Sequence, residues 1–156
     1  MSQKARFLAE NGFYVTTPAG NSMRPFIKGG EDVVTVVPYK REMRKYDAVL
    51  YMRKNGEHVI HRIVGKKAGL FLIRGDNCYY TERIPRESVI GLVDRVRRKD
   101  KEILVEGNKG YAFLVWCWCM LYPLRFAGNA AKRVGAKVIR GIFGRKTGNE
   151  KRAKHR

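Results

Sequence analysis

A serine and a histidine in this chain could together carry out nucleophilic catalysis. Ser22 lies between Gly20-Asn21 and Met23-Arg24-Pro25, a composition typical of a turn. A serine hydroxyl is a poor nucleophile until a neighbouring base removes its proton, and a histidine with an ordinary pKa of about 6.5 can be that base near neutral pH. The competing interpretations are structural, because a serine also caps turns and a lone strand histidine such as His61 also packs in a core.

The surroundings of His61 favour a basic imidazole. The histidine lies in the run Val59–Val64, whose β-branched residues are typical of a strand. On a strand, His61 would share a face with Val59 and Ile63, so its ring should project from a largely apolar surface. Burial there would favour the neutral form, which can accept a proton and later return it to a leaving amine.

The body of the chain must position these two residues, and its pattern predicts a mainly β domain. Asn55-Gly56 predicts a hairpin between Tyr51 and Val59 that pairs the two flanking strands. The first 18 residues predict a short helix that ends at Gly12, followed by a strand. Short apolar runs separated by Gly, Asn, Pro or charged residues predict the other strands: Val33–Val37, Ala48–Met52, Val59–Val64, Leu70–Arg74, Val89–Val96 and Ile103–Val105. This spacing is typical of a compact β-barrel or sandwich.

Three segments resemble, in order, the boxes of a known peptidase family. GNSMRPFIKGGEDVVTV (residues 20–36) is similar to the SMxP box of the signal peptidases and of the self-cleaving repressors of the SOS response, in which the serine is the nucleophile. KYDAVLYMRKNGEHVIHRIVG (residues 45–65) resembles the box with the base, which is Lys in bacterial signal peptidases and His in the endoplasmic-reticulum and archaeal type. LFLIRGDNCYYTERIPRESVIGLV (residues 70–93) resembles the GDN box, which carries an acid. The resemblance covers roughly residues 18–96 and implies Ser22 as nucleophile and His61 as base.

The resemblance also implies an acid that orients the histidine, and two residues compete for this role. Asp76 belongs to the GDN motif, whereas Glu82 stands six residues later, where the endoplasmic-reticulum type has Asp. Either would hold the second ring nitrogen of His61 and fix its tautomer. We expect Glu82 or Asp76 to do so, with Asp76 also tying down its loop.

The oxyanion of a tetrahedral intermediate needs hydrogen-bond donors, and the backbone N–H of Ser22 on a tight turn could supply one. Members of the family often add a hydroxyl two residues before the nucleophile, a position that Gly20 takes in this chain. We therefore expect the substrate and oxyanion neighbourhood to consist of Gly20, Asn21, Met23 and Pro25.

These features predict a serine endopeptidase that removes leader or signal segments from peptides or proteins, bound as extended strands. No cofactor or metal is expected, because Cys78, Cys117 and Cys119 have neither zinc-site nor disulfide-framework spacing. One alternative is a basic nucleic-acid-binding or regulatory protein that keeps the fold of the repressors. That class has a DNA-binding domain and a Lys base, which this chain lacks, so nucleic acid is not the expected partner. The other alternative is an inactive membrane-associated subunit.

The region after position 106 predicts membrane association. The chain has a net charge of +19, and residues 125–156 hold eleven Lys and Arg against Glu150 alone. Residues 111–124 form an uncharged aromatic run that is shorter than the 20 or so residues of a membrane span, and Arg125–Phe143 has the pattern of a basic amphipathic helix. We expect peripheral or re-entrant attachment to an anionic membrane.

The expected organisation has three parts. Residues 1–106 form the catalytic domain, residues 107–145 the apolar and amphipathic helical region, and residues 146–156 a basic disordered tail. The opening segment lacks the apolar run of a secretory signal, and no transmembrane helix is expected, so the chain should otherwise be cytoplasmic.

Overall fold

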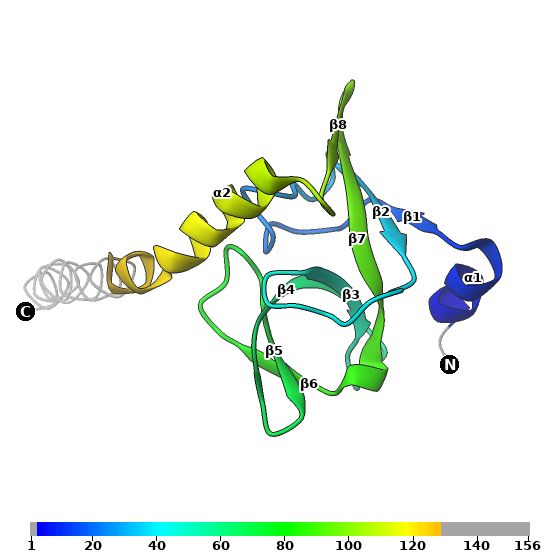
Figure 1. Ribbon diagram of the computed structural model, residues 1–156, viewed down its shortest axis with the longest axis horizontal. Helices are drawn as coiled ribbons and strands as arrows, with labels where there is room; N and C mark the ends of the chain where they lie inside the picture. The colour runs from blue at the N-terminus through cyan, green and yellow to red at the C-terminus, as the bar shows by residue number, and fades with distance from the viewer. Residues whose placement is uncertain (1–2, 129–156) are drawn as a thin grey trace, which may run out of the picture. The chain divides into compact units, whose positions relative to one another are not determined.

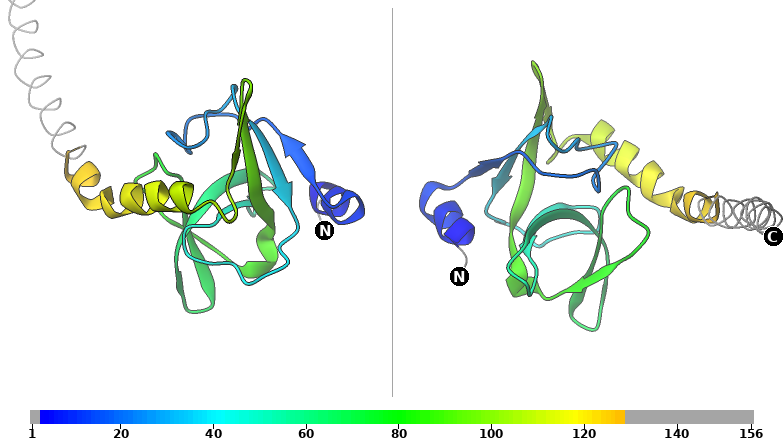
Figure 2. Two further views of the ribbon diagram at one scale, coloured as in Figure 1. Left: turned by 45° about the horizontal axis from the view of Figure 1, so that its top comes forward. Right: turned by 180° about the vertical axis from the view of Figure 1, so that it is seen from behind.

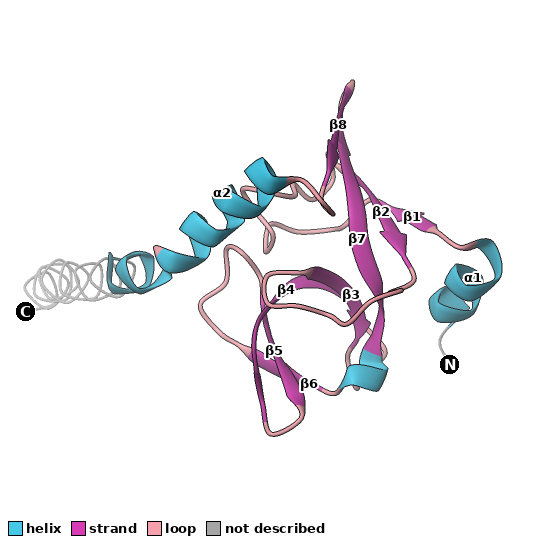
Figure 3. Cartoon of the chain, viewed as in Figure 1, coloured by secondary structure: helices cyan, strands magenta, loops and turns pink. Residues whose placement is uncertain are grey.

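The computed structural model describes residues 3–128 and shows a mainly β protein with short helices (Figure 1, Figure 3). The helices are α1 (Gln3–Asn11), the single-turn η1 (Arg86–Ser88) and α2 (Lys109–Met120). The strands are β1 (Tyr14–Thr16), β2 (Val33–Val37), β3 (Ala48–Met52), β4 (His58–Lys67), β5 (Leu70–Arg74), β6 (Glu82–Ile84), β7 (Val89–Arg98) and β8 (Lys101–Leu104). The prediction of a mainly β domain is confirmed.

All strands pair antiparallel in one sheet with the order β1-β2-β7-β3-β4-β5-β6, and β8 pairs with β7. In the described part of the chain, β1 and β6 each pair on one side only, so the sheet is open. It is therefore neither the closed barrel nor the two-sheet sandwich that the strand spacing suggested. Register shifts between β2 and β7, β3 and β7, and β4 and β5 explain how it can curl without closing, because bulges bend and twist a strand (Figure 2).

Strands β2, β3 and β5 have the bounds that the sequence predicts, whereas β4 and β7 extend further and β6 was not predicted. The predicted hairpin joins β3 to β4 and pairs Tyr51 with Val59. The turn is built around Gly56, whose φ of 83° lies in the left-handed region. Helix α1 ends at Asn11, directly before Gly12 with a φ of 76°.

Strand β3 is buried on both faces and separates two apolar clusters. Ala48 and Leu50 belong to one cluster, and Val49 and Tyr51 to the other, because successive side chains of a strand point to opposite faces. The first cluster also contains Leu8 of α1, so the helix is held against the sheet by its buried side chain. The neighbouring strand β4 must share this two-sided arrangement, and it carries the predicted base.

The chain forms two compact units, Met1–Cys119 and Met120–Arg156, and the first contains the sheet together with nearly all of α2. In the second unit, residues 122–128 are helical and the rings of Tyr122 and Phe126 lie 6.0 Å apart. The predicted amphipathic helix beyond residue 128 and the predicted tail 146–156 lie outside the described residues. Within residues 3–128, no helix has both the length and the apolar character needed to cross a membrane.

Candidate active site

Ser22 lies on the turn between β1 and β2 and lines a cavity of about 290 Å³. His61 of β4 lines the same cavity, so residues 39 positions apart in sequence meet there. Of the four neighbours that the sequence suggested, Gly20 and Met23 line the cavity, whereas Asn21 and Pro25 do not. The side chain of Met23 is buried in the first apolar cluster, which anchors the turn directly after the serine.

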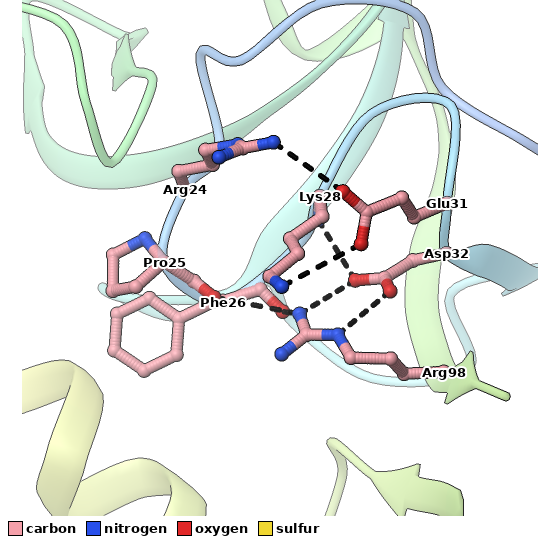
Figure 4. A network of polar contacts seen from close by, with 7 residues as sticks. All are labelled: Arg24, Pro25, Phe26, Lys28, Glu31, Asp32 and Arg98. Atoms are coloured by element: carbon pink, nitrogen blue, oxygen red, sulfur yellow. Dashed lines mark hydrogen bonds and ion pairs between the residues drawn. The ribbon is translucent and has the colours of Figure 1, made fainter. Parts of the chain in front are cut away.

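An ion pair holds the segment that follows Ser22 against the end of β7 (Figure 4). Asp32 is fully buried, and its carboxylate accepts hydrogen bonds from Arg98 at 2.8 and 2.7 Å and from the backbone N–H of Lys28 at 2.8 Å. Arg98 also donates to the carbonyl oxygen of Phe26 at 3.3 Å. Burial acts to raise the pKa of Asp32, but the hydrogen bonds from Arg98 and Lys28 outweigh it and hold the pKa below its usual range. The turn is thus fixed from its far side.

Two glycines allow the backbone behind Ser22 to pack closely. Gly20 has a φ of 81°, which is strained for residues with a side chain. A Cβ on Gly29 would lie only 1.8 Å from the carbonyl oxygen of Gly20. The backbone conformation therefore favours glycine at position 20, where members of the family that the sequence resembles often have a hydroxyl residue. At position 29, the turn has no room for a side chain.

His61 is only 1% exposed and pairs with Val49 across the β3–β4 hairpin. It lies on the face of β4 that the alternation with Val59 and Ile63 predicts, beside the second apolar cluster. Burial lowers the pKa of His61 below 6.5, and the charge of Glu82 opposes this only in part. The imidazole is therefore neutral near pH 7, as a general base requires.

The Nδ1 atom of His61 faces an acidic and a phenolic group. The Tyr51 hydroxyl hydrogen-bonds Nδ1 at 3.2 Å, and the Glu82 Oε1 atom lies 3.4 Å from Nδ1. The Tyr51 hydroxyl and the Glu82 carboxylate therefore both approach the same ring nitrogen. Because an ionised carboxylate only accepts hydrogen bonds, the nearby Glu82 favours the tautomer with the proton on Nδ1, which leaves the Nε2 lone pair free to take a proton.

Glu82 remains ionised because it is paired with a cation. Arg53 donates to its two carboxylate oxygens at 2.8 and 2.5 Å and also to Glu57 at 2.7 Å. Burial acts to raise the pKa of Glu82, but the hydrogen bonds from Arg53 and Tyr51 lower it overall. A negative charge is therefore present beside the imidazole near neutral pH.

The opposite ring nitrogen of His61, Nε2, lies near the turn that contains Ser22. A Cβ placed on Gly75 would lie 2.7 Å from the carbonyl oxygen of Ser22, 2.8 Å from the Cys78 Sγ atom and 3.0 Å from His61 Nε2, so these three atoms border one small space. Within the described residues, no hydrogen bond joins the Ser22 hydroxyl to the imidazole. Such contacts are often long in an enzyme without substrate and tighten in the complex.

Asp76 lies near this site, but its carboxylate is bound by a different cation. Arg62, which is fully buried, donates to both carboxylate oxygens of Asp76 at 2.7 Å. The same guanidinium donates to the carbonyl oxygen of Tyr46 at 2.8 Å and to the hydroxyl of Tyr111 at 3.3 Å. Of the two acids that the sequence suggested, Glu82 is the one beside Nδ1 of His61, and Asp76 ties its loop to β4.

Sequence reasoning missed Tyr51 and Arg53, which complete the surroundings of His61. The hairpin register contained a usable signal for Tyr51. With Tyr51 opposite Val59, residue 51 lies diagonally across from residue 61 on the same face, within reach of an aromatic side chain. Arg53 gave no such signal, because its partner Glu82 comes from a strand 29 residues away.

The described residues contain no group of three or more His, Cys, Asp or Glu side chains that could hold a metal ion. The fold and site thus define a mainly β domain in which a serine and a neutral histidine line one cavity and an ionised glutamate lies beside the histidine ring. No protein-family model and no curated protein matches the sequence.

Proposed function

We propose that the chain is a serine endopeptidase of the signal-peptidase type, with Ser22 as nucleophile and His61 as general base. The observation that supports this most strongly is the environment of His61. The ring is buried and neutral, its Nδ1 faces the Glu82 carboxylate, and it lines the cavity that also contains Ser22. A histidine that served only to pack a core would not need a paired acid on one nitrogen and a serine near the other.

In the proposed reaction, Nε2 of His61 takes the Ser22 proton as the hydroxyl oxygen attacks the scissile carbonyl carbon. The resulting imidazolium is stabilised by Glu82, and the backbone N–H of Ser22 donates to the oxyanion. His61 then gives its proton to the leaving amine, whose bond to the carbonyl carbon breaks. Water, activated by the same imidazole, hydrolyses the acyl-enzyme and returns the proton to Ser22.

We propose an extended peptide as substrate, cut to release a leader or signal segment. Thr16, Pro18 and Ala19 line the cavity, and they follow or end β1, which pairs only with β2 in the described part of the chain. A peptide could add as a strand along such an edge and place alternate side chains in the cavity. A volume of about 290 Å³ suits a few small side chains rather than a large ligand.

We also propose that the enzyme works at an anionic membrane surface. Three large apolar residues of α2, Phe113, Leu114 and Trp116, are 62%, 59% and 47% exposed, although such side chains are usually buried. In a flotation assay, the full chain should rise with vesicles that contain phosphatidylglycerol, and less so after Phe113→Ser and Trp116→Ser together. If the wild type stays wholly in the soluble fraction, the membrane proposal is wrong.

A fluorophosphonate probe tests the catalytic proposal without knowledge of the substrate. The Ser22 oxygen should attack phosphorus, fluoride should leave, and the hydroxyl proton should pass to His61. We expect mass spectrometry to locate the label on Ser22, and we expect labelling to be lost in Ser22→Ala. In His61→Gln, labelling should be slowed at least about 100-fold, because general bases contribute about 10²–10⁴-fold to rates. Ser88→Ala, which removes the hydroxyl of the serine in η1, is the matched control and should label normally. Equal labelling of Ser22→Ala and wild type would refute the assignment.

A further inference from the structure

Helix α2 has two faces with different surroundings. Tyr111, Val115 and Trp118 follow one another at helical spacing; Tyr111 and Val115 are buried, and Trp118 is half-buried. Phe113 and Trp116 lie on the opposite side of the helix and are exposed, with their rings stacked 6.1 Å apart. The inner face thus packs on the β domain, while the outer face is the one proposed above to meet the membrane.

The inner face contacts the loops around the candidate active site. The indole N–H of Trp118 donates to the carbonyl oxygen of Asp76 at 2.8 Å. The rings of Tyr111 and Trp118 both pack edge-on against Phe26, with centroids 5.5 and 6.2 Å away. The guanidinium carbon of Arg62 lies 5.3 Å from the centre of the Phe26 ring, beneath the same helix face. Helix α2 is therefore bonded both to the loop that contains Asp76 and to the segment that follows Ser22.

A single peptide group connects Trp118 to Ser22. The carbonyl that accepts the Trp118 hydrogen bond belongs to the peptide between Asp76 and Asn77. The N–H of that same peptide, on Asn77, donates to the carbonyl oxygen of Ser22 at 2.7 Å. A peptide group is planar and rigid, so fixing its oxygen also fixes the direction of its N–H. Two hydrogen bonds in series through one amide also polarise and strengthen each other.

We propose that Trp118 is a positioning residue for Ser22, acting through the Asp76–Asn77 peptide. The inference rests on the proposed function insofar as Ser22 is the nucleophile. Trp118 sets the plane of the peptide and the peptide holds the Ser22 carbonyl, a restraint on the turn in addition to the Asp32–Arg98 ion pair. Gly75 directly precedes Asp76 and borders the space between the Ser22 carbonyl oxygen and His61 Nε2, so a tilt of the loop would alter the distance between nucleophile and base.

The chain offers a matched pair of variants for the test. Trp118→Phe keeps an aromatic ring against Phe26 but removes the N–H donor, whereas Trp116→Phe makes the same change on the exposed face of the same helix. The first measurement is fluorophosphonate labelling of Ser22 in the full chain. Trp118→Phe should lower the maximal labelling rate at least about fivefold, because a misplacement of 1 Å costs about 100-fold and a partial tilt costs less. The half-saturating probe concentration and the pH midpoint should stay unchanged, and Trp116→Phe should match the wild type.

The second measurement does not depend on activity. Amide hydrogen exchange of Asn77, followed by NMR, should be about tenfold faster in Trp118→Phe and unaltered in Trp116→Phe. If Trp118→Phe does not fold, a variant with benzothienylalanine at position 118 replaces the N–H by sulfur at nearly constant size. Unchanged labelling and unchanged Asn77 exchange in a folded Trp118 variant would overturn the proposal while leaving the peptidase assignment intact. If the wild type fails to label at Ser22 but Asn77 exchange still responds to Trp118 alone, the peptidase assignment fails and the structural link stands.

Discussion

Replacement of Glu82 by Gln tests whether this residue orients His61, the proposed general base. The change keeps the size of the side chain but removes the charge that faces Nδ1 of His61 at 3.4 Å. A hydrogen bond to a charged group contributes about 1.5–3 kcal/mol, which corresponds to a rate loss of about 10- to 150-fold at 1.36 kcal/mol per tenfold. A separation of 3.4 Å is long for such a bond, and Tyr51 still hydrogen-bonds Nδ1, so we expect a loss near tenfold.

The pH profile of the same variant separates orientation from a general loss of structure. The charge of Glu82 raises the pKa of His61, so its removal should move the midpoint of the labelling profile to lower pH while the plateau falls. Glu57→Gln is the matched control, since Glu57 also binds Arg53 but is exposed, and its charge raises the pKa of His61 less than that of Glu82, so the midpoint should move less. Labelling of Glu82→Gln within twofold of wild type, with an unmoved midpoint, would refute the role of Glu82.

Three further predictions concern the same site. The wild-type labelling rate should rise with pH as His61 loses its proton, with a midpoint below 6.5 because burial lowers the pKa of His61; a labelling midpoint above 7 would contradict the assigned environment. The free energy of unfolding should fall as the pH drops below 6.5, because the unfolded chain binds the proton first. Gly75→Ala should lower both thermal stability and labelling rate, because the new Cβ would lie 2.7 Å from the Ser22 carbonyl oxygen and overpacking of this kind costs about 1–3 kcal/mol. The control Gly65→Ala should resemble wild type, since its Cβ would lie 3.5 Å from the nearest atom, in the Leu72 side chain. Asp76→Asn should cost about 3–5 kcal/mol in urea unfolding, because it leaves a fully buried guanidinium without its anion, and a cost under about 1 kcal/mol would show that the pair is not needed.

The strands that could be predicted from sequence are those whose own residues determine them. The Val- and Ile-rich runs of β2, β3 and β5 lie between turn residues, and their observed bounds agree with the prediction. Strand β6, Glu82-Arg83-Ile84, has two charged residues in three, and its strand conformation comes from pairing with β5. Closure of the sheet was predicted wrongly for a related reason, since the number and spacing of strands do not reveal whether the two end strands meet.

Helix α2 shows a second limit of sequence patterns. Residues 111–124 are apolar on every side, so no periodic stripe indicates which face packs inward. The inward face of α2 is selected by tertiary contacts of individual polar atoms, namely the Tyr111 hydroxyl with Arg62 and the Trp118 N–H with Asp76. Both partners come from the GDN loop and β4, more than 30 residues away, so local pattern alone could not have found them.

The competition between the two acids is decided by strand alternation, which the sequence already contains. His61 and Arg62 are adjacent on β4, so their side chains point to opposite faces of the sheet. The buried cation requires an anion on its own face, and Asp76 supplies it. Glu82 pairs with Ile73, a member of the second cluster, and so lies on the face of His61. Because the desolvation of Arg62 is offset only by a close carboxylate, Asp76 is held away from the imidazole, and Glu82 is left as the acid that can orient it.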